Sequence, residues 1–247
     1  MALRCFKCGA ELEPHYKACP ICGDPISDFV REHMSVPIDG KYEIVSRLGV
    51  GGMGEVYKVR HIHLNSLRVI KLMRANIMTT HGAQERFIRE AQLATQIQHP
   101  NVAILHDFAT LPDQTYYMVW EFIDGINLAQ LIRQKGTLSP REAARISIDA
   151  LLGLDAIHQA GVVHRDVSPE NIMLSAGPGG QQRVKVIDLG IAKQWDATSG
   201  ATETGMFVGK WKYCSPDHLG VLEEGEHIDG RADIYSFGIV LYEMLAG

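Results

Sequence analysis

The chain has 247 residues, of which 46% are hydrophobic and 21% are charged, as is ordinary for a globular protein with one large or two smaller domains. Its net charge of −5 argues against broad nucleic-acid binding through a basic face. The first residues lack a secretion signal, and no apolar run approaches the roughly 20 residues that cross a membrane. We therefore expect a cytoplasmic protein with no membrane segment in this chain and no nucleic-acid partner.

Four of the five cysteines lie in the first 22 residues, in the pairs Cys5-x2-Cys8 and Cys19-x2-Cys22. Without a secretion signal, this spacing favours a metal over disulfides or free thiols, which are the alternatives. Four thiolates in a tetrahedron suit Zn²⁺. Because so short a segment cannot bury a core without its metal, we expect residues 1–24 to be a zinc ribbon. Such a module holds a shape or binds a protein partner.

Residues 25–40 mix Pro, Gly and charged side chains, and this composition predicts a linker. The next segment begins as a strand near Tyr42 and leads into the glycines Gly49, Gly51 and Gly54. Residues 56–60 then alternate like a second strand, whereas a dinucleotide-binding turn is followed by a helix. We interpret the glycines as a flap whose backbone amides approach the phosphates of a nucleotide. A hairpin without a ligand is the alternative.

A third strand carries Lys71, whose amine can reach nucleotide phosphates if a carboxylate fixes its direction. The helical spacing of apolar residues over 81–98 predicts a helix that supplies Glu90, with Glu85 as the weaker candidate. An apolar strand at 116–122 follows. Ser139 and Pro140 then begin a helix. Its expected buried stripe consists of Ile146, Ala150, Leu154 and Ile157.

The stretch from His164 to Asn171 places the carboxylate of Asp166 and the carboxamide of Asn171 five residues apart on a short loop. A pair of short strands follows and ends at Asp188. Such a loop can direct one carboxylate at a hydroxyl group, while a second acid and an amide oxygen hold magnesium. This is the minimum set of groups for moving a phosphoryl group.

Together, these motifs resemble the eukaryotic-like (Hanks-type) serine/threonine protein kinases of bacteria, over residues 41–247. The resemblance implies an α+β, bilobal fold, with a β-rich N-lobe at about 41–120 and a helical C-lobe at about 124–247. It also implies an ATP-dependent serine/threonine protein kinase that transfers the γ-phosphate to protein hydroxyls. By this resemblance we expect an incomplete C-lobe, whose large central helix is the last element of the sequence. That helix is apolar on nearly all faces, so we expect an exposed apolar patch and aggregation.

The resemblance also assigns roles to individual residues. Asp166 would accept the proton of the substrate hydroxyl, Asn171 and Asp188 would hold magnesium, Lys71 would steady the phosphates, and Glu90 would steady Lys71. His164 would support the loop, Asp233 would bind its backbone amides, and Trp120 would take the gatekeeper position. The implied nucleotide contacts are Leu48, Gly49, Val50, Gly51, Gly52, Met53, Gly54, Val56, Val69, Lys71, Trp120, Glu121, Ile123 and Met173.

Residues 188–217 correspond to an activation segment, and Arg165 is placed to receive a phosphate on it. We expect autophosphorylation of this segment, with Thr198, Ser199, Thr202 and Thr204 as candidates. Two positions depart from the family pattern. Ser168 replaces a lysine that contacts the transferred phosphate, and Lys210 replaces a Thr or Ser beside the catalytic acid. These departures favour a second hypothesis, a nucleotide-binding pseudokinase. A third makes the zinc ribbon an adaptor module.

Overall fold

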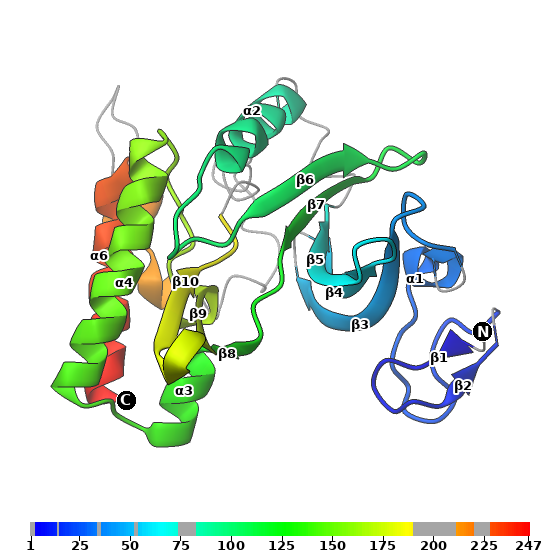
Figure 1. Ribbon diagram of the computed structural model, residues 1–247, viewed down its shortest axis with the longest axis horizontal. Helices are drawn as coiled ribbons and strands as arrows, with labels where there is room; N and C mark the ends of the chain where they lie inside the picture. Colours follow the sequence, from blue (N-terminus) through cyan, green and yellow to red (C-terminus); the bar gives the residue numbers. More distant parts are fainter. Residues whose placement is uncertain are drawn as a thin grey trace. The chain divides into compact units, whose positions relative to one another are not determined.

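The computed structural model describes residues 3–13, 15–33, 36–51, 54–73, 83–189, 211–219 and 228–247 (Figure 1). The chain forms two compact units. The first unit comprises Met1–Ala75 and Asp107–Phe122, and the second comprises Asn76–His106 and Ile123–Gly247. Among the described residues, no helix has both the length and the apolar character needed to cross a membrane.

A five-stranded sheet forms the centre of the first unit, in the order β3-β4-β5-β7-β6. Strands β3, β4, β5 and β7 pair antiparallel. Alternating side chains on one face of the sheet are almost completely buried, with Tyr57, Ile70 and Val119 at 0% exposure. The bounds are β3 (Tyr42–Gly51), β4 (Gly54–His61), β5 (Ser66–Leu72), β6 (Leu105–Thr110) and β7 (Tyr116–Glu121).

The N-terminal residues form a small two-stranded ribbon, β1 (Leu3–Arg4) and β2 (Glu11–Leu12), with a turn around each cysteine pair. We call residues 3–24 the four-cysteine module. Each turn closes with a glycine, Gly9 or Gly23, that has a positive φ of 75° or 70°. Both glycines occupy the left-handed region that other residues rarely adopt.

The segment predicted as a linker, residues 25–40, contains the helix α1 (Asp28–His33) and packs against the sheet. Val30 is 3% exposed and Ile38 is 0% exposed, and both belong to the same core cluster as Tyr57. The Pro, Gly and charged residues that indicated a linker flank these two apolar anchors. The described residues of this segment therefore form a packed layer over one face of the sheet, where the sequence had predicted a linker.

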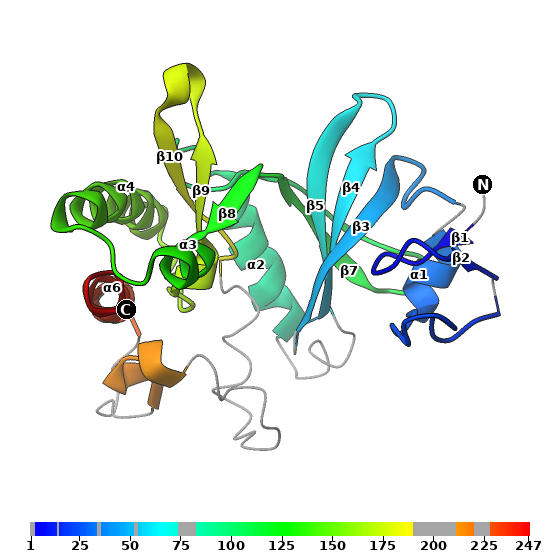
Figure 2. The same ribbon diagram turned by 90° about the horizontal axis from the view of Figure 1, so that it is seen from below.

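Helices and a three-stranded sheet, in the order β10-β9-β8, make up the second unit. Figures 1 and 2 show α4 beside α6, and the two helices contact each other. The helices are α2 (Ala83–Thr95), α3 (Leu128–Lys135), α4 (Pro140–Gln159) and α6 (Gly230–Ala246). The strands are β8 (Gly125–Asn127), β9 (Ile172–Ala176) and β10 (Gln182–Val186). The short 3-10 turns are η2 (Pro169–Asn171), η3 (Pro178–Gly180), η4 (Trp211–Tyr213) and η5 (Pro216–Leu219).

Helix α4 forms as its sequence predicts. The Ser139 hydroxyl accepts a hydrogen bond from the backbone nitrogen of Glu142 at 3.3 Å, and Pro140 occupies the first helical position. The predicted stripe is buried, with exposures of 1% or less at Ile146, Ala150, Leu154 and Ile157. Because this face packs on β10 and α6, α4 is a rigid support for the loop that follows it.

Large apolar side chains are exposed on α6, as the sequence predicts, and also on α4. Exposures reach 59% at Ile148 on α4 and 71% at Tyr242 on α6.

We expect the 247-residue protein to self-associate through such groups. Tyr242→Lys should weaken self-association about tenfold or more, because burying a large apolar side chain contributes about 1.5–3 kcal/mol. Analytical ultracentrifugation measures the association constant. Gln134→Lys, at an exposed position of α3, is the control. Equal association constants for the two variants would contradict it.

Candidate active site and metal centre

Several residues predicted to contact a nucleotide share one face of the sheet in the first unit. Val56 on β4 lies opposite Lys71 on β5, and Val69 lies opposite Trp120 on β7. Val69 and Lys71 are two residues apart on one strand, so both side chains point to the same side. We call this the inner face. The sheet register thus brings together residues that are far apart in sequence.

Trp120 is a bulky element of this face. It is 6% exposed, and within the described part of the chain its buried indole nitrogen has no hydrogen-bond partner. An unsatisfied buried N–H group carries a free-energy cost, so the ring is held there by packing. The gatekeeper role of Trp120 stays a prediction.

The third glycine of the motif is required by packing within the sheet. Gly54 has a φ of +149°, and a Cβ atom there would lie 1.9 Å from the carbonyl oxygen of Leu72 on β5. We expect Gly54→Ala to lower the free energy of unfolding by about 1–3 kcal/mol, since backbone must shift to make room. At Gly49 a Cβ would meet nothing within 4 Å. Gly49→Ala is the matched control in urea unfolding, and equal losses would contradict this explanation.

The predicted catalytic loop follows α4 in the second unit and is organised around a buried histidine. His164 is 0% exposed, and its Nδ1 accepts a hydrogen bond from the backbone nitrogen of Asp166 at 3.2 Å. Because Nδ1 is an acceptor, the proton of the neutral ring lies on Nε2, which donates to the carbonyl oxygen of Ile187 at 3.0 Å. His164 therefore links the loop to the residue immediately before Asp188.

Asn171 joins the same two segments. Its side-chain nitrogen donates to the backbone carbonyl oxygen of Asp166 at 2.7 Å, and its backbone carbonyl oxygen accepts from the backbone nitrogen of Ile187 at 2.9 Å. This orientation fixes which end of the carboxamide is the oxygen, the atom that can bind a hard cation. The structure thus places Asp166, Asn171 and Asp188 on adjoining segments of one unit.

Backbone strain marks the same loop. Arg165 and Asp188 have φ values of 58° and 57°. Non-glycine residues rarely adopt positive φ, and such residues cluster at functional sites. Both side chains have further interactions within the structure. The two strained residues flank the region where Asp166 and Asn171 lie.

Asp233 on α6 fixes the backbone of the loop from beneath. Its carboxylate accepts hydrogen bonds from the backbone nitrogens of His164 and Arg165, both at 2.8 Å, and lies 2.7 Å from Nε2 of His158. Burial acts to raise the pKa of Asp233, but the His158 hydrogen bond and the backbone amides outweigh it, so the pKa is lowered. The role predicted for Asp233 is confirmed. His158 was missed, although a histidine in the last turn of the helix that leads to the loop was a usable signal.

The predicted site residues are divided between the two units. Lys71 and the glycine-rich strands belong to the first unit, whereas Asp166, Asn171 and Asp188 belong to the second. Helix α2 is present where 81–98 predicted a helix, and it includes Glu90. The side chain of Glu90 lies outside the described residues, as do Gly52, Met53, Lys210 and the candidate phosphorylation sites Thr198, Ser199, Thr202 and Thr204.

The four N-terminal cysteines form one cluster whose sulfur atoms all lie within 4.8 Å of one another. None is in a disulfide, and the closest pairs are Cys5 with Cys22 at 3.5 Å and Cys8 with Cys19 at 3.6 Å. Tetrahedral zinc with bonds of about 2.3 Å holds its sulfurs about 3.8 Å apart, so the cluster fits this metal. Burial acts to raise the pKa of Cys19, but the backbone amides of Cys22 and Ile21 lower it to about 7.

His15 stands apart from this cluster. Its ring is exposed, and Nδ1 lies 3.3 Å from the carboxylate of Glu13. Four sulfurs without a fifth donor complete a tetrahedral site, which leaves no open position for a substrate. The cluster is therefore suited to a structural metal.

This fold and this loop define a class of protein. The chain belongs to the protein kinase domain family, whose sequence profile matches residues 42–247. The predicted α+β class, with a β-sheet part and a helical part, is confirmed by solved neighbours. The crystal structure of the Mycobacterium tuberculosis PknI kinase domain superposes with a TM-score of 0.64 at 28% identity, covering 83% of this chain and 74% of that one.

The relatives are bacterial serine/threonine kinases of the predicted kind. The serine/threonine-protein kinase PknB of Mycobacterium leprae (strain TN) is 37% identical over 213 residues, which cover 85% of this chain and 33% of that protein. The serine/threonine-protein kinase pkn3 of Myxococcus xanthus is 33% identical over 219 residues, covering 87% of this chain and 39% of that protein. The chain thus spans well under half the length of both curated relatives.

Proposed function

We propose that this protein is an ATP-dependent serine/threonine protein kinase that transfers the γ-phosphoryl group of ATP to protein hydroxyls. The observation that carries the proposal is the linkage of two segments through His164 and Asn171, which joins the loop that carries Asp166 to Ile187, the residue before Asp188. In phosphoryl transfer the protein acts by positioning and by charge stabilisation, so a fixed arrangement of these groups is the main requirement. Kinase relatives at 33–37% identity support it.

Each group has a distinct task in this proposal. The carboxylate of Asp166 accepts the proton of the attacking hydroxyl, and the oxygens of Asn171 and Asp188 hold magnesium. Lys71 steadies the phosphates, and Glu90 orients Lys71. Bound magnesium would neutralise charge on the phosphates. The remaining proposed nucleotide contacts are Leu48, Gly49, Val50, Gly51, Gly52, Met53, Gly54, Val56, Val69, Trp120, Glu121, Ile123 and Met173.

We propose that residues 41–247 are the kinase domain and that Cys5, Cys8, Cys19 and Cys22 hold a structural Zn²⁺. The fit of the four sulfurs to a tetrahedron supports zinc. Because paired cysteines that are not joined in disulfides are usual in reducing compartments, we place the protein in the cytoplasm. Its proposed substrates are proteins, including its own segment 188–217.

The pseudokinase alternative rests on Ser168 and Lys210, of which the structure describes Ser168. This residue is 0% exposed, and its hydroxyl lies 3.4 Å from the carboxylate of Glu170. It supplies neither the positive charge nor the reach of a lysine toward a transferred phosphate. In this alternative the protein binds nucleotide without transferring phosphate.

One experiment separates the two functions. The purified protein is incubated with magnesium and ATP labelled at the γ-phosphate, alone and with a generic protein substrate. The proposal predicts label on serine or threonine, which acid hydrolysis and phosphoamino-acid analysis identify, and no label without magnesium. Nucleotide binding by calorimetry with no transferred label would establish the pseudokinase instead.

A further inference from the structure

The segment that follows the second cysteine pair, residues 24–27, forms hydrogen bonds with strand β3 just before the glycine-rich turn. One terminal nitrogen of Arg47 lies 2.7 Å from both carboxylate oxygens of Asp24, and the other donates to the carbonyl oxygen of Pro25 at 2.9 Å. Both side chains of this ion pair are only 15% exposed. A pair that is shielded from water and satisfied by several hydrogen bonds holds its geometry better than a surface pair.

The same segment contacts strand β4 just after the glycine-rich turn. The hydroxyl of Ser27 donates to the carboxylate of Glu55 at 2.9 Å and lies 3.3 Å from the hydroxyl of Tyr57. Tyr57 also donates to Glu55. Burial and the Glu55 carboxylate raise the pKa of Tyr57, so its hydroxyl keeps the proton that it donates. A few consecutive residues therefore hold both strands of the hairpin.

These contacts lie on the opposite side of the sheet from the proposed nucleotide site. Arg47 and Tyr57 are directly paired across β3 and β4. Glu55 and Tyr57 point away from the inner face because they alternate with Val56 along the strand. We call their side the outer face. Contacts on the outer face can set the position of the glycine-rich hairpin without occupying space that a nucleotide needs.

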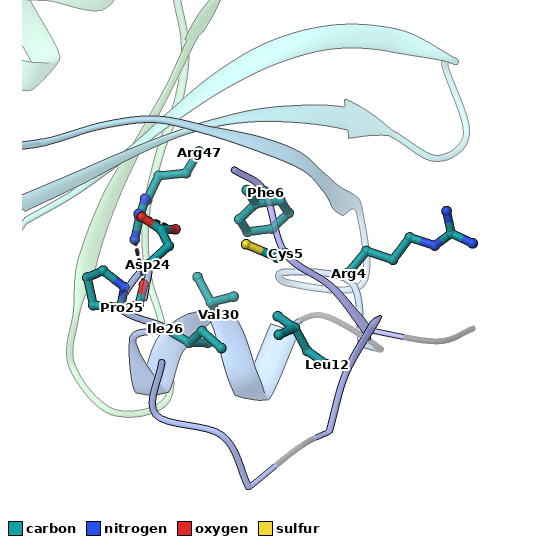
Figure 3. Close-up of a pocket in the computed structure, with 9 residues that line it drawn as sticks. All are labelled: Arg4, Cys5, Phe6, Leu12, Asp24, Pro25, Ile26, Val30 and Arg47. Atoms are coloured by element: carbon teal, nitrogen blue, oxygen red, sulfur yellow. Dashed lines mark hydrogen bonds and ion pairs between the residues drawn. The ribbon is translucent and has the colours of Figure 1, made fainter. Parts of the chain in front are cut away.

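Apolar packing joins the four-cysteine module to the same core. Figure 3 shows Phe6, Ile26 and Val30 gathered beside Cys5, with Asp24 bonded to Arg47 next to them. Ile26 packs against both the core of the module and the core under the sheet, and Phe6, from the first cysteine turn, packs against the latter. The module and the outer face of the sheet thus share one continuous apolar contact.

The position of this segment depends on the cysteine turns. The backbone nitrogen of Cys19 donates to the carbonyl oxygen of Asp24 at 2.8 Å, and that of Ile26 donates to the carbonyl oxygen of Lys17 at 2.9 Å. A module with so few core residues is folded by its metal, and loses its structure when the metal leaves. Loss of the metal would therefore release Asp24 and the residues after it from the outer face.

We propose that the four-cysteine module is a metal-dependent brace on the outer face of the sheet, which holds the glycine-rich hairpin in its nucleotide-binding position. Metal loss then weakens nucleotide binding. The predicted effect of the metal on nucleotide affinity rests on the proposed function. The predicted effect of the metal on the position of the hairpin does not. The expected weakening is on the order of 10-fold, within the about 5- to 150-fold range typical of coupled sites.

The experiment removes zinc from the whole protein with a zinc-selective chelator in excess magnesium, and metal analysis confirms the loss. Hydrogen exchange reports the backbone amides of β3 and β4, and calorimetry reports the affinity for magnesium–ADP. Arg47→Ala and Asp24→Asn break the link while leaving all four cysteines in place. Arg60→Ala, at an exposed position of β4, removes the same charge elsewhere on the hairpin. Circular dichroism and zinc content show that each variant is folded.

We expect zinc removal to speed amide exchange in β3 and β4 and to weaken nucleotide binding in the wild type and in Arg60→Ala. In Arg47→Ala, which keeps the other contacts of the module, zinc removal should change the affinity by a smaller factor than in the wild type and in Arg60→Ala. Unchanged exchange in the zinc-free wild type would overturn the brace. Faster exchange with unaltered affinity would overturn control of the nucleotide site. Faster exchange in a protein that never binds nucleotide would support the brace and refute the proposed function.

Discussion

Replacing Asp166 by Asn is expected to slow phosphoryl transfer by about 10²–10⁴-fold, the usual contribution of a positioned acid–base group. The amide has nearly the shape of the carboxylate but cannot accept the proton of the attacking hydroxyl. Two hydrogen bonds that hold this residue in the loop, to Nδ1 of His164 and from the side chain of Asn171, use its backbone nitrogen and carbonyl oxygen. The substitution should therefore keep both of these bonds.

Initial rates with γ-labelled ATP and a protein substrate measure this effect, and urea unfolding shows that the fold is retained. Asp149→Asn makes the same chemical change on α4, away from the loop, and should keep the wild-type rate. A rate for Asp166→Asn within about 2-fold of the wild type would contradict the role of Asp166 as the base, since such a group contributes at least about 10²-fold.

Replacing Asp233 by Ala is expected to lower the free energy of unfolding by about 3 kcal/mol or more, because three donors lose their acceptor and each such loss costs about 1–3 kcal/mol. The variant leaves the backbone nitrogens of His164 and Arg165 and the ring of His158 without their acceptor. Each buried donor left without a partner carries a desolvation cost. The loop that bears Asp166 should loosen as well, so activity should fall with stability.

Urea unfolding measures the difference, with Asp229→Ala as the control. Asp229 caps the same helix from an exposed position, and its loss should cost about 1 kcal/mol. The pKa of Asp233 is lower in the folded protein than the value of about 3.9 in an unfolded chain. Its stabilising effect is therefore fully present above that pH and is lost as the pH falls below it. A difference between wild type and Asp233→Ala that is as large at pH 3 as at pH 7 would contradict this.

The sequence alone predicted features that depend on local pattern. The buried stripe of α4 follows from helical periodicity, and its start follows from Ser139 and Pro140. The strand after the glycines was indicated by alternation. The approach of Asp233 to the backbone of His164 came from the family resemblance, and the structure confirms it. These features need only neighbours in sequence or a motif of fixed spacing.

Other features depend on contacts between distant segments. Residues 25–40 looked like a linker because their Pro, Gly and charged residues are local signals, whereas the burial of Val30 and Ile38 is set by a sheet formed later in the chain. The glycines were interpreted through phosphate approach, but Gly54 is also required by the Leu72 carbonyl oxygen on a neighbouring strand. Periodicity along one segment cannot show either contact.

The most direct test of the account is a titration of ATP, with and without magnesium, into the wild type, Asp166→Asn and Asp188→Asn. If Asp188 is a ligand of the nucleotide's metal, Asp188→Asn should lose about 10-fold or more of the magnesium-dependent affinity, since even groups that only orient a metal ligand contribute about 10–100-fold. Asp166→Asn should bind like the wild type, because its role begins with the chemical step. Magnesium-dependent affinity that is unchanged in Asp188→Asn would contradict the assignment of Asp188.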